Sequence, residues 1–160
     1  MDNWVDTLLE DGKLVLQLAL ALIISAVVGW ERESRNREAG LRTHMMVGLG
    51  ATLFIGLGPS LVEFMRPETG DAMRFDPTRL LEAVAVGVGF LGAGTIYTSQ
   101  KNNEVHGLTT AASIWAVAAL GIAVALERWV LAICGALLVV GVLRGVHVVQ
   151  QRLKHVPSED

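Results

Sequence analysis

The sequence contains few charged residues. Asp, Glu, Lys and Arg make up 18% of its 160 residues, whereas 52% are apolar and the mean hydropathy is +0.47. Soluble proteins carry about 25% charged residues, so this composition favours a protein that faces lipid. The alternative, a soluble bundle of fully buried helices, requires polar outer faces, which the long apolar segments lack.

The sequence also has a single cysteine, Cys134, which excludes an intrachain disulfide. No basic stretch precedes the first apolar segment, although a cleavable signal peptide begins with positive charge. We therefore expect this segment to remain in the protein as a helix. The motifs HExxH and GxSxG are absent, as is a close pair of carboxylates within an apolar segment, so we expect no enzyme activity. We also expect no cofactor and no nucleic-acid partner, and the residues do not identify a metal site.

Apolar residues occur in runs of membrane length. Three runs of 17, 20 and 22 residues lack formal charge, and two more contain one charge each, Glu82 and Arg144. A hydrocarbon core of about 30 Å is crossed by roughly 20 helical residues. The runs predict an all-α polytopic membrane protein with five transmembrane helices. Their expected bounds are 14–30, 43–62, 80–98, 107–126 and 129–149.

The expected organisation is one transmembrane domain over residues 1–151, followed by a short polar tail at 152–160. Five spans place alternate connections on opposite sides of the membrane. Eight of the 13 Lys and Arg residues then share the side that holds the segment 31–42 and the tail. Positive charge is enriched in cytoplasmic loops. We therefore predict an inner-membrane protein with its amino terminus outside and its carboxyl terminus in the cytoplasm.

Small residues recur at helical spacing in three of the expected helices. They are Ala21, Ser25 and Gly29, then Ala85, Gly89 and Ala93, and finally Gly141 and Gly145. Such stripes allow close helix packing in lipid, within one chain or between chains. Because the stripes are numerous, we expect a homo-oligomer.

Three motifs occur in order along the chain. The first is charged and covers residues 29–33 and 38–44. The second consists of residues 76–79 and the glycine-rich segment 87–96, and the third is the segment 107–115. Together they resemble the MgtC/SapB family of bacterial inner-membrane proteins, over most of the chain from Gly29 to Gly121. Two positions differ, because many relatives have a basic residue at His106 and a Gln close to Glu82.

The resemblance implies a non-enzymatic membrane protein that is linked to growth at low magnesium, to intracellular survival and virulence, and to regulation of partner membrane proteins. The namesake proteins carry a soluble carboxyl-terminal domain, so this chain resembles a short form. We expect a regulatory or stress-response protein. The alternative is a small channel or transporter for Mg²⁺ or another cation, which would need polar side chains at several depths of the membrane.

Two sets of residues are candidates for function. The first set consists of glycines that either allow close helix packing or line an ion path: Gly87, Gly89, Gly92 and Gly94. The second set is a polar cluster at the cytoplasmic mouth and consists of Glu31, Arg32, Arg42, Thr43, Thr95, Thr109 and Thr110. Two helix amino termini in this cluster attract an anion or a carboxylate. If Glu31 supplies the carboxylate, the cluster is a structural lock; otherwise it binds an ion, a phosphate group or a partner.

A short repeat accompanies the polar cluster. Gly40-Leu41-Arg42-Thr43 and Gly107-Leu108-Thr109-Thr110 each open an expected helix on the same side of the membrane. The chain is therefore expected to contain two similar helical hairpins and one further helix, as in transporters with internal repeats.

Overall fold

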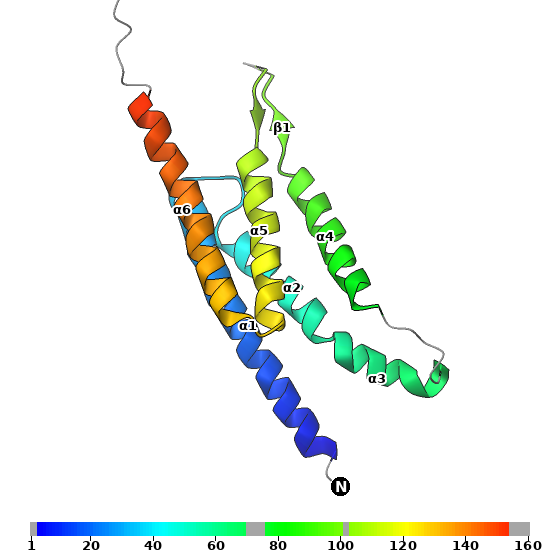
Figure 1. Cartoon of the computed structure of the whole chain (residues 1–160). Helices are drawn as coiled ribbons and strands as arrows, with labels where there is room; N and C mark the ends of the chain where they lie inside the picture. The colour runs from blue at the N-terminus through cyan, green and yellow to red at the C-terminus, as the bar shows by residue number, and fades with distance from the viewer. Residues whose placement is uncertain (1–2, 70–75, 101–102, 154–160) are drawn as a thin grey trace, which may run out of the picture.

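The computed structural model of the chain describes residues 3–69, 76–100 and 103–153, which form an all-α bundle with one small β-hairpin (Figure 1). The elements are α1 (Asn3–Ser34), α2 (Leu41–Gly56), α3 (Gly58–Thr69), α4 (Pro77–Ala93), β1 (Tyr97–Thr98), β2 (Val105–His106), α5 (Leu108–Ala125) and α6 (Trp129–Leu153). Helices α1 and α2 form one antiparallel hairpin and α4 and α5 form a second, with α6 beside α1 and α5.

The core lies where α1, α2 and α5 meet, because these three helices contact one another. The small-residue stripe of α1 faces this contact: Ala21 and Ser25 are buried, and Gly29 packs against the backbone of Leu41 in α2. On the opposite side of α1, Ile23 and Val27 are exposed. An exposed apolar side chain is stable in a helix that faces lipid, so the distribution fits a membrane bundle.

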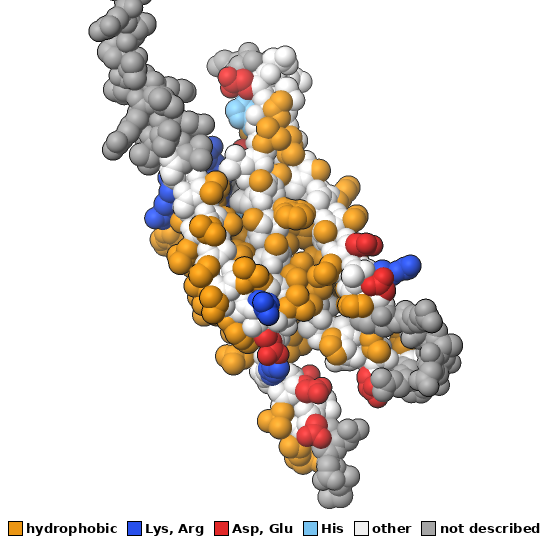
Figure 2. Space-filling model, in the orientation of Figure 1, with side chains coloured by type: hydrophobic (Ala, Val, Ile, Leu, Met, Phe, Trp, Pro, Cys, Tyr) orange, Lys and Arg blue, Asp and Glu red, His pale blue; other side chains and the backbone are white. Residues whose placement is uncertain are grey.

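Helix α5 is the central helix. Its buried residues occur along its whole length and include Ile114, Val117 and Val124, all fully buried. This burial follows because α1, α2, α4 and α6 all pack against α5. Hydrophobic side chains also cover most of the visible flank of the bundle, where lipid tails would lie (Figure 2).

Three helical segments are long and apolar enough to cross a membrane: Trp4–Ser34, Leu41–Met65 and Leu108–Ala125, of which the second covers α2 and the first part of α3. Helix α6 contains a shorter apolar segment, Trp129–Gly145. Helix α4 has 17 residues, which correspond to about 25 Å at the rise of an α-helix. The chain is thus an all-α polytopic membrane protein, and the count of five spans stays a prediction for α4 and α6.

Two expected helix bounds are wrong at the amino-terminal half of the chain. The first helix begins at Asn3 instead of residue 14, because absence of charge marks the apolar part of a helix and not its ends. The expected helix 43–62 is divided at Leu57 into α2 and α3. Pro59 explains the division, since it lacks the N–H that would continue the hydrogen-bond ladder.

The expected helix 80–98 is also wrong at both ends. Asp76 caps α4 by accepting the Thr78 N–H, and Pro77 occupies the first helical turn, so the helix starts early. It ends at Ala93, and Tyr97 and Thr98 pair with His106 and Val105 in the β-hairpin. Aromatic and β-branched residues favour this extended pairing. The last helix continues past 149 to Leu153, and residues 154–160 of the expected tail lie outside the described residues.

Candidate functional site

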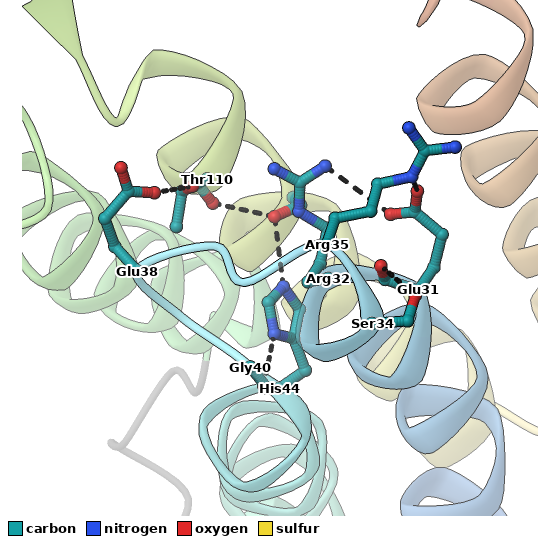
Figure 3. A network of polar contacts seen from close by, with 9 residues as sticks. Glu31, Arg32, Ser34, Arg35, Glu38, Gly40, His44 and Thr110 are labelled. Carbon is teal, nitrogen blue, oxygen red and sulfur yellow. Dashed lines mark hydrogen bonds and ion pairs between the residues drawn. The ribbon is translucent and has the colours of Figure 1, made fainter.

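A polar network lies at the end of the bundle where α1 ends and α2 and α5 begin (Figure 3). The carboxylate of Glu31, 1% exposed, forms ion pairs with two arginines of its own helix end. Its Oε2 is 3.5 Å from Arg32 Nη1, and its Oε1 contacts Arg35 Nε. Arg32 is 3% exposed, so two opposite charges are buried side by side. A buried charge is tolerated only when it is paired, which makes Glu31 the anchor of both arginines.

Two other glutamates meet the amino termini of the neighbouring helices. The caps of α2 and α5 are Gly40 and Gly107, neither of which offers a capping side chain. Glu33 Oε2 accepts the Leu41 N–H at 2.9 Å at the start of α2, and Glu38 Oε2 accepts the Thr110 hydroxyl at 2.7 Å at the start of α5. Glu33 therefore replaces the missing cap of α2, whereas Glu38 binds a side chain of the first turn of α5 and leaves the backbone N–H groups of that turn without a carboxylate cap in the described part of the chain.

The contact between Glu38 and Thr110 also affects ionisation. The hydrogen bond from the Thr110 hydroxyl is the main cause that lowers the pKa of Glu38 below its ordinary value, with smaller help from Arg37 and Arg32. A hydrogen bond to the ionised form stabilises that form. Glu38 is therefore a carboxylate at neutral pH.

His44 links α2 to α5 inside the bundle. Its side chain is fully buried, with Nδ1 2.8 Å from the Gly40 carbonyl oxygen and Nε2 3.0 Å from Ser113 Oγ. A carbonyl only accepts, so Nδ1 carries a hydrogen. The Ser113 hydroxyl also lies 2.8 Å from the Thr110 carbonyl oxygen. Its one hydrogen goes either to Nε2 of a neutral ring or, when the ring is charged and donates from Nε2, to Thr110.

A second polar contact joins α2 and α5 nearer the middle of the bundle. The buried Thr52 hydroxyl is 2.9 Å from both the Gly48 and the Gly121 carbonyl oxygens. Gly48 lies directly against Ser25 of α1, and a Cβ at Gly121 would be 2.5 Å from the Gly48 carbonyl oxygen. Glycine is required at both positions because the helix backbones approach more closely than a side chain permits.

A cavity of about 450 Å³ opens beside the network. Its polar lining comes from the end of α1, the following connection, and the segment from β2 into α5, and α6 adds an apolar wall. The lining residues are Arg32, Arg35, Arg37, Glu38, Val105, His106, Gly107, Leu108, Thr109, Thr110, Val142 and Leu143.

A second, apolar groove of about 490 Å³ lies between α2 and α4. Phe54 of α2 and Leu91 of α4 are among its lining residues, and so is Gly87. It is separate from the polar network.

The structure divides the predicted polar cluster. Glu31, Arg32 and Thr110 belong to the network, and Thr109 lines the polar cavity. Arg42 is exposed on the first turn of α2. The other two residues do not belong to the network. Thr43 lines the apolar groove, and the hydroxyl of Thr95, just after α4, donates to the Gly92 carbonyl oxygen in the last turn of α4.

The four candidate glycines also separate. Gly92 packs against Ala111 of α5, whereas a Cβ at Gly87 or Gly89 would meet no atom within 4 Å. Gly94 follows the end of α4, where a Cβ would meet the carbonyl oxygens of Leu91 and Phe90 in the preceding turn. Glu82 is exposed near the start of α4, and Arg144 is exposed on α6.

Sequence reasoning missed several residues of the network, namely Glu33, Arg35, Glu38, His44 and Ser113. Glu38 and His44 lie in the first charged motif, and Ser113 lies in the third. A histidine and a serine within apolar runs were the available signal, since a polar group inside a membrane helix needs a partner. The described residues include no group of three or more His, Cys, Asp or Glu side chains that could hold a metal ion.

Comparisons with known proteins give relatives over most of the chain. It is 38% identical over 142 residues to "Putative magnesium transporter YhiD" of Escherichia coli K12, which covers 89% of this chain and 64% of YhiD. It is 41% identical over 105 residues to the protein MgtC of Brucella abortus, covering 66% of this chain and 39% of MgtC. It is 38% identical over 128 residues to SrpB of Synechococcus elongatus, covering 76% of this chain and 68% of SrpB.

The chain thus spans less than two thirds of the length of YhiD and of MgtC. No solved structure matches it. The model of the MgtC family matches residues 18–152, which include α2, α4 and α5 in full and most of α1 and α6. This match, the charged end of α1 and the two glycine-capped helices of the polar network agree, and the chain belongs to the MgtC family.

Proposed function

We propose that this protein is a non-enzymatic regulator of magnesium homeostasis in the bacterial inner membrane and that it acts by binding another membrane protein. The magnesium link rests on family membership and on the name of its relative YhiD. A role in intracellular survival is the further expectation that the family resemblance carries.

The close packing of α1, α2 and α5 is the observation that favours regulation over conduction. Gly48 contacts Ser25, Gly121 contacts the backbone of α2, and Val117 fills the space between them without exposure. An ion path needs a continuous series of polar groups that replace the hydration shell. The polar side chains buried at the centre of this bundle, Ser25 and Thr52, lie in direct contact with the backbone of neighbouring helices, so a path through one chain would require these helices to separate.

A magnesium transporter is the second candidate function. The name of YhiD supports it, and the groove between α2 and α4 gives it a location between helices. Gly87 exposes backbone in this groove. A transporter could use unwound backbone carbonyls there to bind an ion.

Flux measurements separate the two functions. Purified protein in liposomes with an internal magnesium indicator should give no Mg²⁺ entry above that of empty liposomes, while an ionophore gives full entry. The same protein should restore growth at low magnesium to a strain that lacks it. Mg²⁺ entry that depends on the protein would contradict the regulatory proposal and establish the transporter.

Self-association is part of the proposal. Gly141 and Gly145 are exposed on α6, and a Cβ at either position would meet no atom within 4 Å. We expect this surface to contact a second copy, because small residues allow helices to pack closely in lipid. Gly141→Leu should then convert an oligomer into monomers in mild detergent without a change in helix content, and Ile23→Ala, at an exposed position of α1, serves as the control. A wild-type protein that is strictly monomeric would contradict this part.

The orientation is proposed from the charge distribution, with the polar network on the cytoplasmic side. A variant in which Cys134 is replaced by Ala can carry a new cysteine at Asn36 or at Asn3. An impermeant thiol reagent added to intact cells should label the cysteine at Asn3 and should not label the one at Asn36. The reverse pattern would overturn the orientation.

A further inference from the structure

Three arginines line the polar cavity beside the network. Arg32 comes from the last turn of α1, and Arg35 and Arg37 lie in the connection to α2. Among the described residues, two carboxylates are paired with these arginines or line the cavity with them: Glu31, which is paired with Arg32 and Arg35, and Glu38, which accepts the Thr110 hydroxyl. The group therefore retains one positive charge before His106 is counted.

Arg32 supplies an independent indication that a ligand belongs here. Its side chain is 4% exposed, it lines the cavity, and its Nε has no hydrogen-bond partner among the described residues. Its contact with Glu31 uses Nη1 at 3.5 Å, which is a long ion pair. Buried donors are normally satisfied, and a guanidinium bonds an anion through several N–H groups at once. Arg32 is thus the buried cation of the cavity with donor capacity still unused.

The amino terminus of α5 adds a second source of positive potential. Helix α5 has 18 residues, and its cap, Gly107, lines the cavity together with Leu108 and Thr109. The first N–H groups of a helix and its dipole attract negative charge. The cap offers no side-chain hydrogen bond, and Glu38 reaches this turn through the Thr110 hydroxyl. The start of α5 and the arginines therefore face the same space.

We propose that this cavity binds a phosphate group, held by the guanidinium groups of Arg32 and Arg37 and by the first turn of α5. Arginine forks and helix amino termini match the geometry of phosphate oxygens. Val142 and Leu143 of α6 form an apolar wall of the same cavity, which suits a phosphate attached to a less polar group. The source is the headgroup of an anionic lipid or a soluble phosphate compound. This proposal goes beyond the proposed regulatory function and holds whether or not the protein binds a partner.

The experiment compares two variants with a matched control. Arg37 is exposed, so Arg37→Gln removes a charge of the cavity and leaves the buried pairs in place. Arg32→Gln removes the buried cation, and its folding is checked by helix content. Arg42→Gln is the control, because Arg42 is an exposed arginine at the same end of the bundle that does not line the cavity.

The first arm uses purified protein in mild detergent and follows thermal unfolding with inorganic phosphate or pyrophosphate at constant ionic strength. A ligand that binds the folded protein raises the Tm. The second arm uses native mass spectrometry after exchange into mixed micelles with phosphatidylglycerol or phosphatidylcholine, and counts the lipids that stay bound.

Wild type and Arg42→Gln should behave alike. A higher Tm with phosphate or pyrophosphate in the first arm identifies a soluble phosphate compound as the ligand. Retention of phosphatidylglycerol over phosphatidylcholine in the second arm identifies a lipid headgroup. Arg37→Gln should weaken this binding about tenfold, as expected for the loss of one charge-assisted contact. Binding that is equal in wild type, Arg37→Gln and a folded Arg32→Gln would overturn the site. Absence of any effect in both arms for wild type would overturn the proposal as well.

Discussion

Two regions of this protein are rich in glycine, and only one of them uses its glycines for helix contact. At the junction of α1, α2 and α5, Gly29, Gly48 and Gly121 all lie against neighbouring helices. In α4, Gly87 and Gly89 face open space. Each of these glycines lies in an apolar helix that carries another small residue three or four positions away. Spacing of small residues therefore permits a close helix contact but does not select it.

The difference has a physical origin in the neighbours of each helix. Helix α5 is surrounded by α1, α2, α4 and α6, so its small residues meet backbone on several sides. Among the described residues, helix α4 packs mainly against α5 and α2, and Val86 and Phe90 on its surface are exposed. Gly92, which faces α5, is the glycine of α4 that packs against a neighbouring helix. The comparison can be tested by substitution in each region.

The largest effect is expected for Gly121→Ala. The new Cβ would lie 2.5 Å from the Gly48 carbonyl oxygen and 3.1 Å from Thr52 Oγ1, so α2 and α5 must separate. Overpacking of this kind destabilises by about 1–3 kcal/mol. Thermal unfolding in detergent, followed by size-exclusion chromatography, should show a lower Tm and a lower yield.

Gly89→Ala is the matched control for Gly121→Ala. It has space for the methyl group and should leave the Tm unchanged or raise it, because alanine favours a helix over glycine by roughly 0.5–1 kcal/mol. Equal loss of stability in both variants would mean that the two glycine-rich regions do not differ as described.

The next effect concerns the polar link between α2 and α5. His44→Phe keeps a ring in the fully buried space but leaves the Gly40 carbonyl and the Ser113 hydroxyl without the imidazole. Loss of partners for buried groups should lower stability by about 1–3 kcal/mol. The same unfolding measurement applies, with the exposed Met46→Ala of α2 as control. An unchanged Tm for His44→Phe would show that the link does not stabilise the bundle.

A smaller effect of opposite sign is expected for Ser25→Ala, at the contact between α1 and α2. The Ser25 hydroxyl is fully buried against Gly48, and its oxygen has no hydrogen-bond partner among the described residues. Removal of an unsatisfied buried hydroxyl should raise stability by up to about 1 kcal/mol. Ser113→Ala is the control and should lower it, since the Ser113 hydroxyl has two partners. A lower Tm for Ser25→Ala would indicate that its hydroxyl has a stabilising role.

The smallest effect is a pH dependence at Glu38. Its pKa is lowered in the folded protein by the Thr110 hydroxyl, so its contribution is present above the unfolded pKa of about 4.3 and is lost as pH falls through the folded value. Because Glu38 is exposed, the contribution should be a few tenths of a kcal/mol, roughly that of a surface ion pair. Glu38→Gln should flatten the Tm profile between neutral and acidic pH, and Thr110→Val should do the same. A profile that these variants leave unchanged would contradict the assignment.

Much of the fold could be predicted from the runs of apolar residues, but the helix ends could not. The expected 107–126 and the start of the last helix at 129 agree with α5 and α6 within one residue. The errors occurred where another interaction decided the end of a helix. Examples are Pro59, which divides α2 from α3, and the pairing of Tyr97 with His106, which converts an expected helix end into a β-hairpin.

The structure brings part of the predicted polar cluster together, but other carboxylates meet the helix starts. Glu31 was the internal candidate for the two helix amino termini, with a bound ion, phosphate group or partner as the alternative. It pairs with Arg32 and Arg35 of its own helix end, and Glu33 and Glu38 meet α2 and α5. All three glutamates are close in sequence, so their order along the chain cannot indicate which one reaches which helix.

The sequence by itself determined that this chain is a helical membrane protein, that its charges gather at the helix ends, and that it resembles the family to which it belongs. These properties follow from transfer of side chains between water and lipid, which depends on composition along the chain. Only the tertiary structure decided which glycines touch, that His44 meets Ser113, and that Arg32 is buried beside a cavity. Such contacts depend on the rotation and approach of helices that are far apart in sequence, and these are set by packing of all the helices together.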